Sequence, residues 1–543
     1  MPLRPVMLAA CLALVLAACG GDSTAQPPTP SPSPDPAATS TPEPTSTAPP
    51  PPESATPAPE STGTPRLEPT LTPEEITDEH VLSLIYWTEI DFWNRFVLFP
   101  DTSDTTRDIL RAMARDPEER WLPYLVDLAA VPVPYSAFVY RILTEIRPDH
   151  PYPIFPITEE LGLRTPADET DLYVEFKHRL IEGIQEDMGA FLDPEKRRLI
   201  SAQEIFWGGV TVDGIPPLEH PDFITPDEAA AWIGPKDRII GVEINGDARA
   251  YPRRIIDWHE MVNDTVGGVP VSLAYCTLCG SAILYDGRVG EEVYRFGTSG
   301  LLYRSNKLMY DRTTNTLWEQ FTGEPVWGDL VGSGIQLDVL PVVHTTWDEW
   351  LAQHPDTLVL DIETGHARDY GEGVAYARYF ASSGLMFPVP DRSGPIAVKD
   401  SVYAVRLNDE VVGYPILLLG AEDFLQDEIG GDPVVVFATA DRSGGRAYAA
   451  PPERVVAYDA ETGVATTEDG ATWRVTEGAL LGPSGEELER LPGHNAFWFA
   501  LVNHAPRFRL YEPPPAETSR ALSGCNLFAY LEGTSIAATA CTL

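Results

Sequence analysis

Positive charge is scarce in this sequence. Its 543 residues contain 38 lysines and arginines against 81 aspartates and glutamates, and the formal net charge is −43. A surface of this sign repels the phosphates of nucleic acids and the headgroups of anionic lipids. We therefore expect no nucleic-acid partner and interpret the acidity as a contribution to solubility.

Long apolar runs are also lacking after the first twenty residues. The run at residues 6–18 follows Arg4 and is too short to span a bilayer as a permanent helix, which is the layout of a secretory signal. Residues 16–19 (Leu-Ala-Ala-Cys) resemble a bacterial lipobox, in which the signal is cut before Cys19 and that thiol is lipidated. An ordinary signal with an incidental cysteine is the alternative. We expect a lipoprotein anchored to the membrane through Cys19, on the extracytoplasmic side of a bacterial cell envelope.

Cysteine is rare, with six residues in the whole chain. Cys11 would leave with the signal and Cys19 would carry lipid, so four remain: Cys276, Cys279, Cys525 and Cys541. Outside the cytoplasm, thiols oxidise unless a metal holds them or a reductant acts on them. A disulfide between Cys525 and Cys541 is the simplest pairing, although the sequence does not fix the connectivity. Cys276 and Cys279 remain as candidate site residues.

The chain is too long for one hydrophobic core. Residues 20–72 are rich in proline, serine and threonine and are expected to form a solvated tether. Residues 73–200 are expected to form a small helical domain, since apolar residues recur at helical spacing at 105–115, 118–130, 136–146 and 172–188. From residue 201 onward, short apolar runs alternate with glycines and turn residues. The sequence thus predicts an α+β protein, helical first and β-rich afterwards.

Local patterns in the β-rich part predict individual elements. Residues 210–217 are interpreted as a strand and turn, and 239–251 as a hairpin around Asn245-Gly246-Asp247. Further strands are expected at 271–275 and 282–285, and a short helix at 347–352. These elements place the candidate cysteines between two strands.

The second half of the sequence repeats the first. Residues 245–252 correspond to 408–415, and the Gly-Gly-x-Pro-Val sequence at 267–271 corresponds to 430–434, both with an offset of 163. We interpret this as a tandem duplication, with copy one at 201–380 and a degenerate copy two at 381–543, packed together. At this offset Glu422 stands opposite His259, Asp423 opposite Glu260, Thr439 opposite Cys276 and Arg442 opposite Cys279. Only copy one therefore has the reactive residues His259, Glu260, Cys276 and Cys279.

The candidate site is Cys276-x-x-Cys279-Gly280. Because β-like residues follow Gly280, a helix-opening redox motif is disfavoured, and a turn between two strands that aims both sulfurs to one side is expected. Thiolates suit copper or zinc, but a closed zinc site needs four ligands, and copy two offers no second cysteine pair. A disulfide that closes the turn is the structural alternative.

His259 is the first candidate for an additional metal ligand or for a base that activates Cys276. Glu260 could accept a hydrogen bond from its imidazole or act as a base. His344 and His354 are weaker candidates. The structural alternative for His259 is a hydrogen-bonded core histidine.

A second group of polar residues follows the Phe-Gly-Thr-Ser-Gly sequence at 296–300. Arg304, Lys307 and Arg312 could hold an anion or a substrate, together with Tyr310 and Asp311. Ion pairing with Asp311 is the default interpretation for these cations. Met309 is expected to pack in the core.

Residues 239–360 resemble the bacterial family known as domain of unknown function 3179. The resemblance rests on ordered motifs: Tyr-Pro at 251–252, Trp-His-Glu at 258–260, Val-Asn-Asp at 262–264, Tyr-Cys-Thr-Leu-Cys at 275–279, Phe-Gly-Thr-Ser-Gly-Leu at 296–301, Tyr-Asp-Arg at 310–312 and Leu-Trp at 317–318. It implies a secreted or lipid-anchored protein and carries no established reaction. It also implies that the first cysteine is the more regular one, which favours a Cys276–His259 pair.

Three functions are compatible with these residues. One is an extracytoplasmic metal site, with copper or zinc held by Cys276, Cys279 and His259. Another is thiol chemistry, in which Cys276 is the nucleophile or redox thiol, His259 activates it and Cys279 resolves. The third is a non-enzymatic surface module that binds a protein or glycan, with the cysteines as a disulfide.

Overall fold

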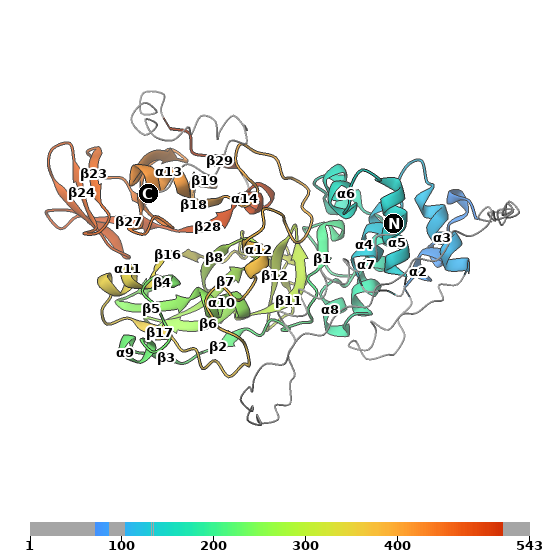
Figure 1. Ribbon diagram of the computed structural model, residues 1–543, viewed down its shortest axis with the longest axis horizontal. Helices are drawn as coiled ribbons and strands as arrows, with labels where there is room; N and C mark the ends of the chain where they lie inside the picture. The colour runs from blue at the N-terminus through green and yellow to red at the C-terminus, as the bar shows by residue number, and fades with distance from the viewer. Residues whose placement is uncertain (1–70, 86–103, 132, 134, 506, 514–543) are drawn as a thin grey trace, which may run out of the picture.

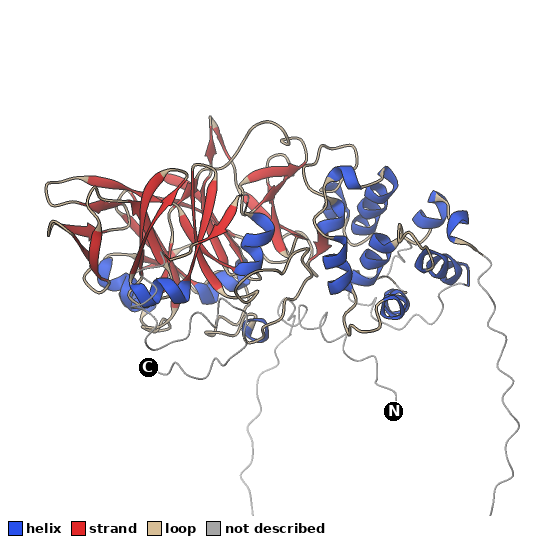
Figure 2. Cartoon of the chain, turned by 90° about the horizontal axis from the view of Figure 1, so that it is seen from above, coloured by secondary structure: helices blue, strands red, loops and turns tan. Residues whose placement is uncertain are grey.

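The structure is a computed structural model in which residues 71–85, 104–131, 133, 135–505 and 507–513 are described. It is a mixed α+β structure, with helices in the N-terminal part and mostly strands in the C-terminal part (Figure 1). Figure 2 shows a group of helices at one end of the molecule and the strands at the other. Within the described ranges no helix has the length and apolar character needed to cross a membrane. Cys19, the expected tether and the Cys525–Cys541 pair lie outside these ranges.

The N-terminal part is built from short helices. Their bounds are α2 (Asp78–Leu82), α3 (Asp104–Ala114), α4 (Leu122–Ala130), α5 (Ser136–Ile146), α6 (Ile154–Leu161), α7 (Asp171–Glu182) and α8 (Glu186–Ala190). The helices expected at 105–115, 118–130, 136–146 and 172–188 are thereby confirmed, the last as two helices. The helix α6 was not expected, because three prolines lie at or beside it.

A buried polar contact joins two of these helices. Lys177 of α7 lies 2.5 Å from the Asp127 carboxylate of α4, and the Tyr173 hydroxyl donates a hydrogen bond to the other carboxylate oxygen. The hydrophobic cluster around them continues into the β-rich part and includes Leu301 and Trp327. The helices therefore pack directly on the strands that follow, without a separating layer of solvent.

Three five-stranded sheets follow the helices. The first has the order β1 (Ile205–Trp207), β11 (Phe296–Tyr303), β12 (Asn306–Asp311), β13 (Leu317–Glu319), β14 (Glu324–Trp327). The second has the order β15 (Val339–Leu340), β8 (Ser281–Asp286), β7 (Val269–Cys276), β6 (Met261–Val266), β2 (Leu218–Glu219). The third has the order β16 (Val343–Thr346), β4 (Arg238–Ile244), β5 (Asp247–Pro252), β17 (Leu358–Leu360), β3 (Phe223–Ile224). Three short helices accompany them: α9 (Pro226–Ala229), α10 (Arg253–His259) and α11 (Trp347–Gln353).

The local predictions for this region hold with one exception. The hairpin β4–β5 turns at Asn245 and Gly246, whose φ angles of 53° and 80° are those that the Asn-Gly pair favours. The strands at 271–275 and 282–285 and the helix at 347–352 are also confirmed. The strand expected at 210–217 is wrong, because this segment forms a turn at Asp213, which has a φ of 52°. Its backbone bonds instead to Thr298 at the edge of β11.

The remaining strands form two further sheets. A four-stranded sheet has the order β28 (Gly493–Phe497), β18 (Ser401–Leu407), β19 (Glu410–Pro415), β29 (Phe508–Leu510). An eight-stranded sheet has the order β20 (Phe424–Ile429), β21 (Asp432–Ala438), β22 (Gly445–Ala449), β27 (Glu487–Leu491), β26 (Ala479–Leu481), β25 (Thr472–Val475), β24 (Val464–Thr467), β23 (Val455–Asp459). The helices α13 (Ile416–Glu422) and α14 (Trp498–His504) pack against them, and β9 (Arg288–Val289) pairs with β10 (Glu292–Val293) on its own.

Candidate functional site

The two candidate cysteines occupy the first and fourth positions of a turn. The strand β7 ends at Cys276, and the amide of Cys279 donates a 3.2 Å hydrogen bond to the Cys276 carbonyl. Gly280 follows with a φ of 59° and lets the chain enter β8, as the sequence predicts. Both thiols are free and are no more than 1% exposed.

The Cys279 thiol is buried in a hydrophobic cluster and has two polar neighbours. Burial, followed by a hydrogen bond with Cys276, raises the pKa of Cys279 well above its ordinary value. The Cys279 sulfur lies 3.4 Å from the side-chain oxygen of Asn306 and 3.6 Å from the Ser305 carbonyl. The two sulfurs are therefore neighbours, and the second is held by the β11–β12 turn.

From Asn306 the polar contacts lead into the second half of the chain. The Asn306 amide donates to Glu319, and the same Glu319 oxygen lies 3.0 Å from the His504 imidazole at the end of α14. Burial alone would raise the pKa of Glu319, but the hydrogen bond and charge of His504 hold it below its ordinary value. The amide of Phe497, next to α14, also donates to the Cys279 carbonyl at 2.7 Å. The cysteine turn thus lies where the two halves meet.

Glu260 and Lys307 lie on the other side of the cysteines. Lys307 is 4% exposed, and its ammonium donates a 2.6 Å hydrogen bond to the Glu260 backbone carbonyl. Burial lowers the pKa of Lys307, while the charges of Glu260 and Cys276 act in the opposite direction. Burial likewise raises the pKa of Glu260, against the charge of Lys307 and hydrogen bonds from Thr277. A buried carboxyl and a buried amine therefore flank Cys276.

These two groups line a small, partly open cavity. Its volume is about 40 Å³, enough for water-sized molecules. Glu260, Lys307 and Leu278 line it from the site, and Thr298 and Ser299 line it from β11. Residues 376, 386 and 387, from the segment that connects the two halves, complete the wall.

His259 is not brought together with the sulfurs. One ring nitrogen lies 2.7 Å from the Pro216 carbonyl, and the other lies 2.6 Å from the Tyr370 hydroxyl. The ring is fully buried, and burial lowers the pKa of His259 to about 4. The separation from the thiol site arises because α10 ends at His259 and Glu260 adopts a φ of 56°, so the two neighbours contact different parts of the structure. The expected Glu260–His259 contact is replaced by Glu260 with Lys307 and Thr277.

The polar residues after β11 are already paired within the protein. Arg304 binds Glu204 and the Asn503 carbonyl, and Arg312 binds Asp213 and Glu219. The Tyr310 hydroxyl also donates to Asp213, while Asp311 accepts from Trp318 and from the backbone of Thr313 and Thr314. The expected pairing of Arg304, Lys307 or Arg312 with Asp311 is therefore replaced by these other contacts. Met309 is fully buried in the core, as expected.

The weaker histidine candidates lie apart from the cysteines. Burial lowers the pKa of His344 to about 3, and this residue belongs to β16. His354 stacks on Trp350, with ring centroids 4.1 Å apart, and burial lowers its pKa as well. Across the residues that the structure describes, no group of three or more histidine, cysteine, aspartate or glutamate side chains is arranged to hold a metal ion.

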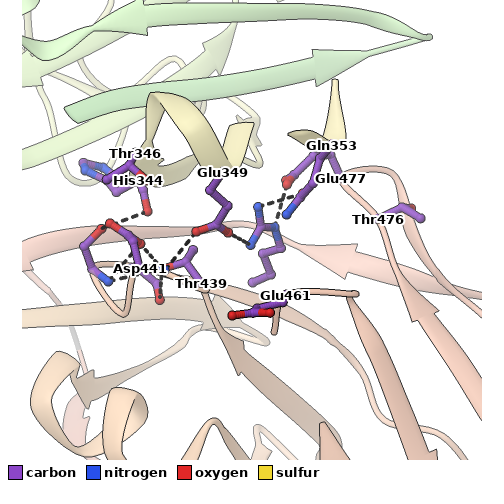
Figure 3. Close-up of polar contacts among 12 residues, drawn as sticks. His344, Thr346, Glu349, Gln353, Thr439, Asp441, Glu461, Thr476 and Glu477 are labelled. Atoms are coloured by element: carbon purple, nitrogen blue, oxygen red, sulfur yellow. Dashed lines mark hydrogen bonds and ion pairs between the residues drawn. The ribbon is translucent and has the colours of Figure 1, made fainter. Parts of the chain in front are cut away.

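A larger groove of about 670 Å³ lies on the boundary between the halves. Figure 3 shows Glu349, Gln353 and Glu477 gathered on one side, with Asp441 and Thr439 beside Glu349. Arg446, whose side chain is 2% exposed, binds Glu349, Gln353 and Glu477. Because these charges satisfy one another, we treat the groove as part of the boundary between the halves.

Several site residues had no signal of their own in the sequence. Asn306 contacts Cys279, and Glu319 and His504 follow it in a chain of contacts, only because of folding. The sequence suggests Lys307 as an anion contact and gives no sign that it is the partner of Glu260. The motif at 296–301, by contrast, did mark the cavity, since Thr298 and Ser299 line it. A position within a family motif was thus the sequence feature that could identify residues of the cavity.

The fold and the site define a β-rich protein with an N-terminal helical part and a buried thiol pair at the boundary of two β-sheet halves. The chain belongs to the family described as protein of unknown function (DUF3179), whose sequence profile matches residues 212–508 of 543. No curated protein and no solved structure matches it. The resemblance inferred from the motifs is confirmed, and three of these motifs contribute Glu260, Leu278 and Thr298 to the same cavity.

Proposed function

We propose that Cys276 and Cys279 form a redox site that cycles between a dithiol and a disulfide. The observation that carries the proposal is the pair of free, adjacent thiols at the first and fourth positions of one turn. The ends of such a turn lie within ~7 Å, which includes the Cα separations that a disulfide requires. Oxidation would therefore need little movement of the backbone.

The partner in this proposal is a disulfide, which exchanges with the pair in two steps. The Cys276 thiol loses its proton, and the resulting thiolate attacks one sulfur of the incoming disulfide and releases the other as a thiolate, which takes up a proton. The Cys279 thiol then loses its proton and attacks Cys276, so that the intramolecular bond forms and the second sulfur of the partner leaves. Two electrons and two protons pass from the site to the partner.

The surroundings fit Cys276 as the attacking thiol and Cys279 as the resolving one. Lys307 is the buried amine whose pKa the charge of Cys276 raises, so a negative sulfur and the ammonium would attract each other in this scheme. Glu260, whose pKa burial raises, can hold a proton beside the same group. Cys279 keeps its proton until the second step, because burial and the bond with Cys276 raise its pKa. The base expected at His259 is replaced in this scheme by Lys307 and Glu260.

Redox titration tests this proposal. The native protein is equilibrated in buffers with different ratios of reduced to oxidised dithiol, quenched in acid, alkylated in denaturant and mapped by mass spectrometry. We expect a reversible Cys276–Cys279 bond, with a midpoint within the range of thiol–disulfide oxidoreductases, about −270 to −120 mV. Cys276→Ser and Cys279→Ser are the matched controls. The proposal is contradicted if Cys276 and Cys279 stay reduced in every redox buffer, or form a disulfide only in denaturant.

Copper(I) binding is a second candidate, because the two sulfurs are adjacent. Thiolates select copper(I), whereas zinc prefers four ligands. We expect the reduced protein to retain copper(I), to lose this capacity in the Cys276→Ser variant, and to bind zinc much more weakly. Equal retention of copper by the Cys276→Ser variant would exclude this metal site.

We also propose that the protein is held at the outer face of a bacterial cell membrane by lipid on Cys19. The lipobox-like sequence at 16–19 and the proline-rich segment after it support this. Membrane fractionation of the full chain and of the Cys19→Ser variant tests it. The wild-type protein should sediment with membranes and the variant should not; the same distribution for both would count against a lipid anchor.

We infer further that the two halves arose by duplication. In the first half the Tyr251 hydroxyl donates to Asp264 at 2.8 Å, and in the second the Tyr414 hydroxyl donates to Asp427 at 3.0 Å. The Asn245 amide donates to the Gly267 carbonyl as the Asn408 amide does to Gly430. Each residue of one contact differs from its counterpart by 163 positions, which supports the duplication read from the sequence.

The duplication assigns different tasks to the two copies. The turn that begins at Thr439 is closed by the Arg442 amide at 2.9 Å, as Cys279 closes the turn at Cys276, but it has no thiol. Copy two supplies Phe497 and His504 to the thiol site and acts as a scaffold in this proposal. An experimental structure in which residues 238–276 fail to superpose on residues 401–439 would overturn the duplication.

A further inference from the structure

The segment that connects the two halves covers the thiol site. It runs from the end of β17 at Leu360 to the start of β18 at Ser401, and the structure describes all of it. Within these described residues, 361–400, the regular structure is limited to the short helix α12 (Ala377–Phe380). A connection of this length with so little regular structure is uncommon in a compact protein and is typical of active-site lids. In Figure 1, α12 lies over the sheets of the first half.

One contact ties this segment to the cysteine turn itself. The Tyr379 hydroxyl donates a 2.6 Å hydrogen bond to the carbonyl of Leu278, which stands between the two cysteines. Burial, and then the charges of Cys279 and Cys276, raise the pKa of Tyr379. The Lys399 ammonium lies 3.6 Å from the centre of the Tyr379 ring and donates to the Ser382 carbonyl. The segment is thus fastened directly above the thiols.

A second contact fastens the segment through His259. The Pro216 carbonyl can only accept a hydrogen bond, so the His259 nitrogen facing it must carry the proton. The other nitrogen then accepts from the Tyr370 hydroxyl at 2.6 Å, and Tyr370 in turn accepts from Thr364. His259 is adjacent in sequence to Glu260 of the thiol site, but its ring contacts the connecting segment through Tyr370 and does not contact a sulfur.

The same segment lines the cavity beside Glu260 and Lys307. It contributes Tyr376, Met386 and Phe387 to the wall. Glycines stand on both sides of this stretch, at Gly373, which has a φ of 67° with no atom near its missing side chain, and at Gly384. Residues 381–384 are exposed. The exposed residues 381–384 thus separate two groups that pack on the hydrophobic cluster around the cysteines, Tyr376 to Phe380 and Leu385 to Phe387. Apolar contacts joined by an exposed, glycine-containing turn describe a segment that can open while the sheets stay folded.

We propose that residues 370–387 are a lid that controls access to Cys276 and Cys279, held shut by the Tyr379–Leu278 and Tyr370–His259 hydrogen bonds. The inference rests on the proposed redox site and adds its regulation. In the closed state the thiols are no more than 1% exposed, so a partner disulfide cannot reach sulfur until the lid moves. His259 and Tyr370 are positioning residues of the lid.

Site-specific alkylation tests the lid. The reduced native protein is treated with iodoacetamide or with a bulky maleimide, and labelling of Cys276 and Cys279 is followed over time by peptide mass spectrometry. Tyr379→Phe and Tyr370→Phe each remove one hydrogen bond and keep the ring, so we expect labelling to accelerate about twofold to tenfold, the factor of one such bond. Tyr152→Phe, at a position 47% exposed in the helical part, is the matched control and should label at the wild-type rate.

Two results would contradict the lid proposal. One is that Cys276 and Cys279 are labelled at the wild-type rate in both Tyr379→Phe and Tyr370→Phe. The other is a wild-type labelling rate that rises with urea as steeply as global unfolding does, since access would then require the whole fold to open. If a variant does not fold, amide hydrogen exchange on the wild-type protein tests the proposal instead. The amides of residues 374–387 should exchange faster than those of β7. Equal protection of the two segments would refute the lid.

The labelling rate and the midpoint potential together distinguish failure of the lid proposal from failure of the redox proposal. The midpoint potential is an equilibrium quantity and does not depend on how fast a reagent reaches sulfur. A normal potential with unchanged labelling would remove the lid and keep the redox site. Accelerated labelling in a protein that never forms the Cys276–Cys279 bond would keep the lid and remove the redox proposal.

Discussion

His259 shows how burial dominates the protonation behaviour of one residue. Its ring is fully buried, and burial comes first among the causes that lower its pKa to about 4, with the charges of His366 and Arg368 acting in the same direction. In the unfolded chain the imidazole has a pKa of about 6.5. The folded state therefore resists a proton that the unfolded state accepts.

The sign of the pH effect follows from this difference. Above about pH 6.5 the ring is neutral in both states, and between about pH 6.5 and 4 the unfolded state alone gains the proton, so stability falls as the pH falls. We expect the stability of the wild-type protein relative to a His259→Asn variant to decrease by about 3 kcal/mol from pH 7 to pH 4. Urea unfolding at several pH values measures it. A pH-independent difference would mean that the ring is not kept neutral by burial.

At the scale of the element, the cysteine turn depends on a glycine. Gly280 has a φ of 59°, and a Cβ there would lie 3.2 Å from the Phe497 ring. A left-handed residue with a side chain costs about 1–2 kcal/mol, and the contact with Phe497 adds to this cost. We expect Gly280→Ala to lower the free energy of unfolding by about 2–3 kcal/mol.

The hairpin β4–β5 offers the matched control for this substitution. Gly246 has a φ of 80°, but no atom lies within 4 Å of a Cβ at this position. Gly246→Ala should therefore show the backbone cost alone, about 1 kcal/mol. Equal losses for the two variants in urea unfolding would show that packing against Phe497 contributes nothing to the turn.

At the scale of the whole molecule, buried charges join the halves. Arg446 binds Glu349 and Gln353 from α11 and Glu477 from the second half, and Arg490 binds the other oxygen of Glu477. Removing Arg446 leaves the buried Glu349 carboxylate without its ionic partner and Glu477 with Arg490 alone, and breaking a buried ion pair in this way costs about 3–5 kcal/mol. We expect this loss from Arg446→Met.

Surface ion pairs provide the comparison for Arg446. Lys196 lies 2.5 Å from Asp329, but both side chains are at least 40% exposed. Lys196→Met should change the free energy of unfolding by less than about 1 kcal/mol. Calorimetry or urea unfolding distinguishes the two cases, and a comparably small effect at Arg446 would show that the boundary does not depend on its charges.

Much of the local structure followed from neighbouring residues. The Asn-Gly pair predicted the hairpin at 245–246, helical spacing predicted α5 and α11, and the Cys-x-x-Cys-Gly sequence predicted the turn. These features depend on backbone angles and periodicity within a few residues. Local signals were mixed at residues 210–217, where a predicted strand is a turn, and at the proline-bordered helix α6, which the sequence did not predict.

The sequence by itself determined that helices precede a β-rich part, the family and the turn that carries Cys276 and Cys279. Only the tertiary structure decided which side chains surround these thiols: it turned His259 toward Tyr370 and brought Lys307, Asn306 and His504 to the site. The reason is physical. A turn is defined by bonds a few residues apart, whereas the partners of a buried group are set by how sheets and helices pack, and the spacing of residues along the chain does not record that packing.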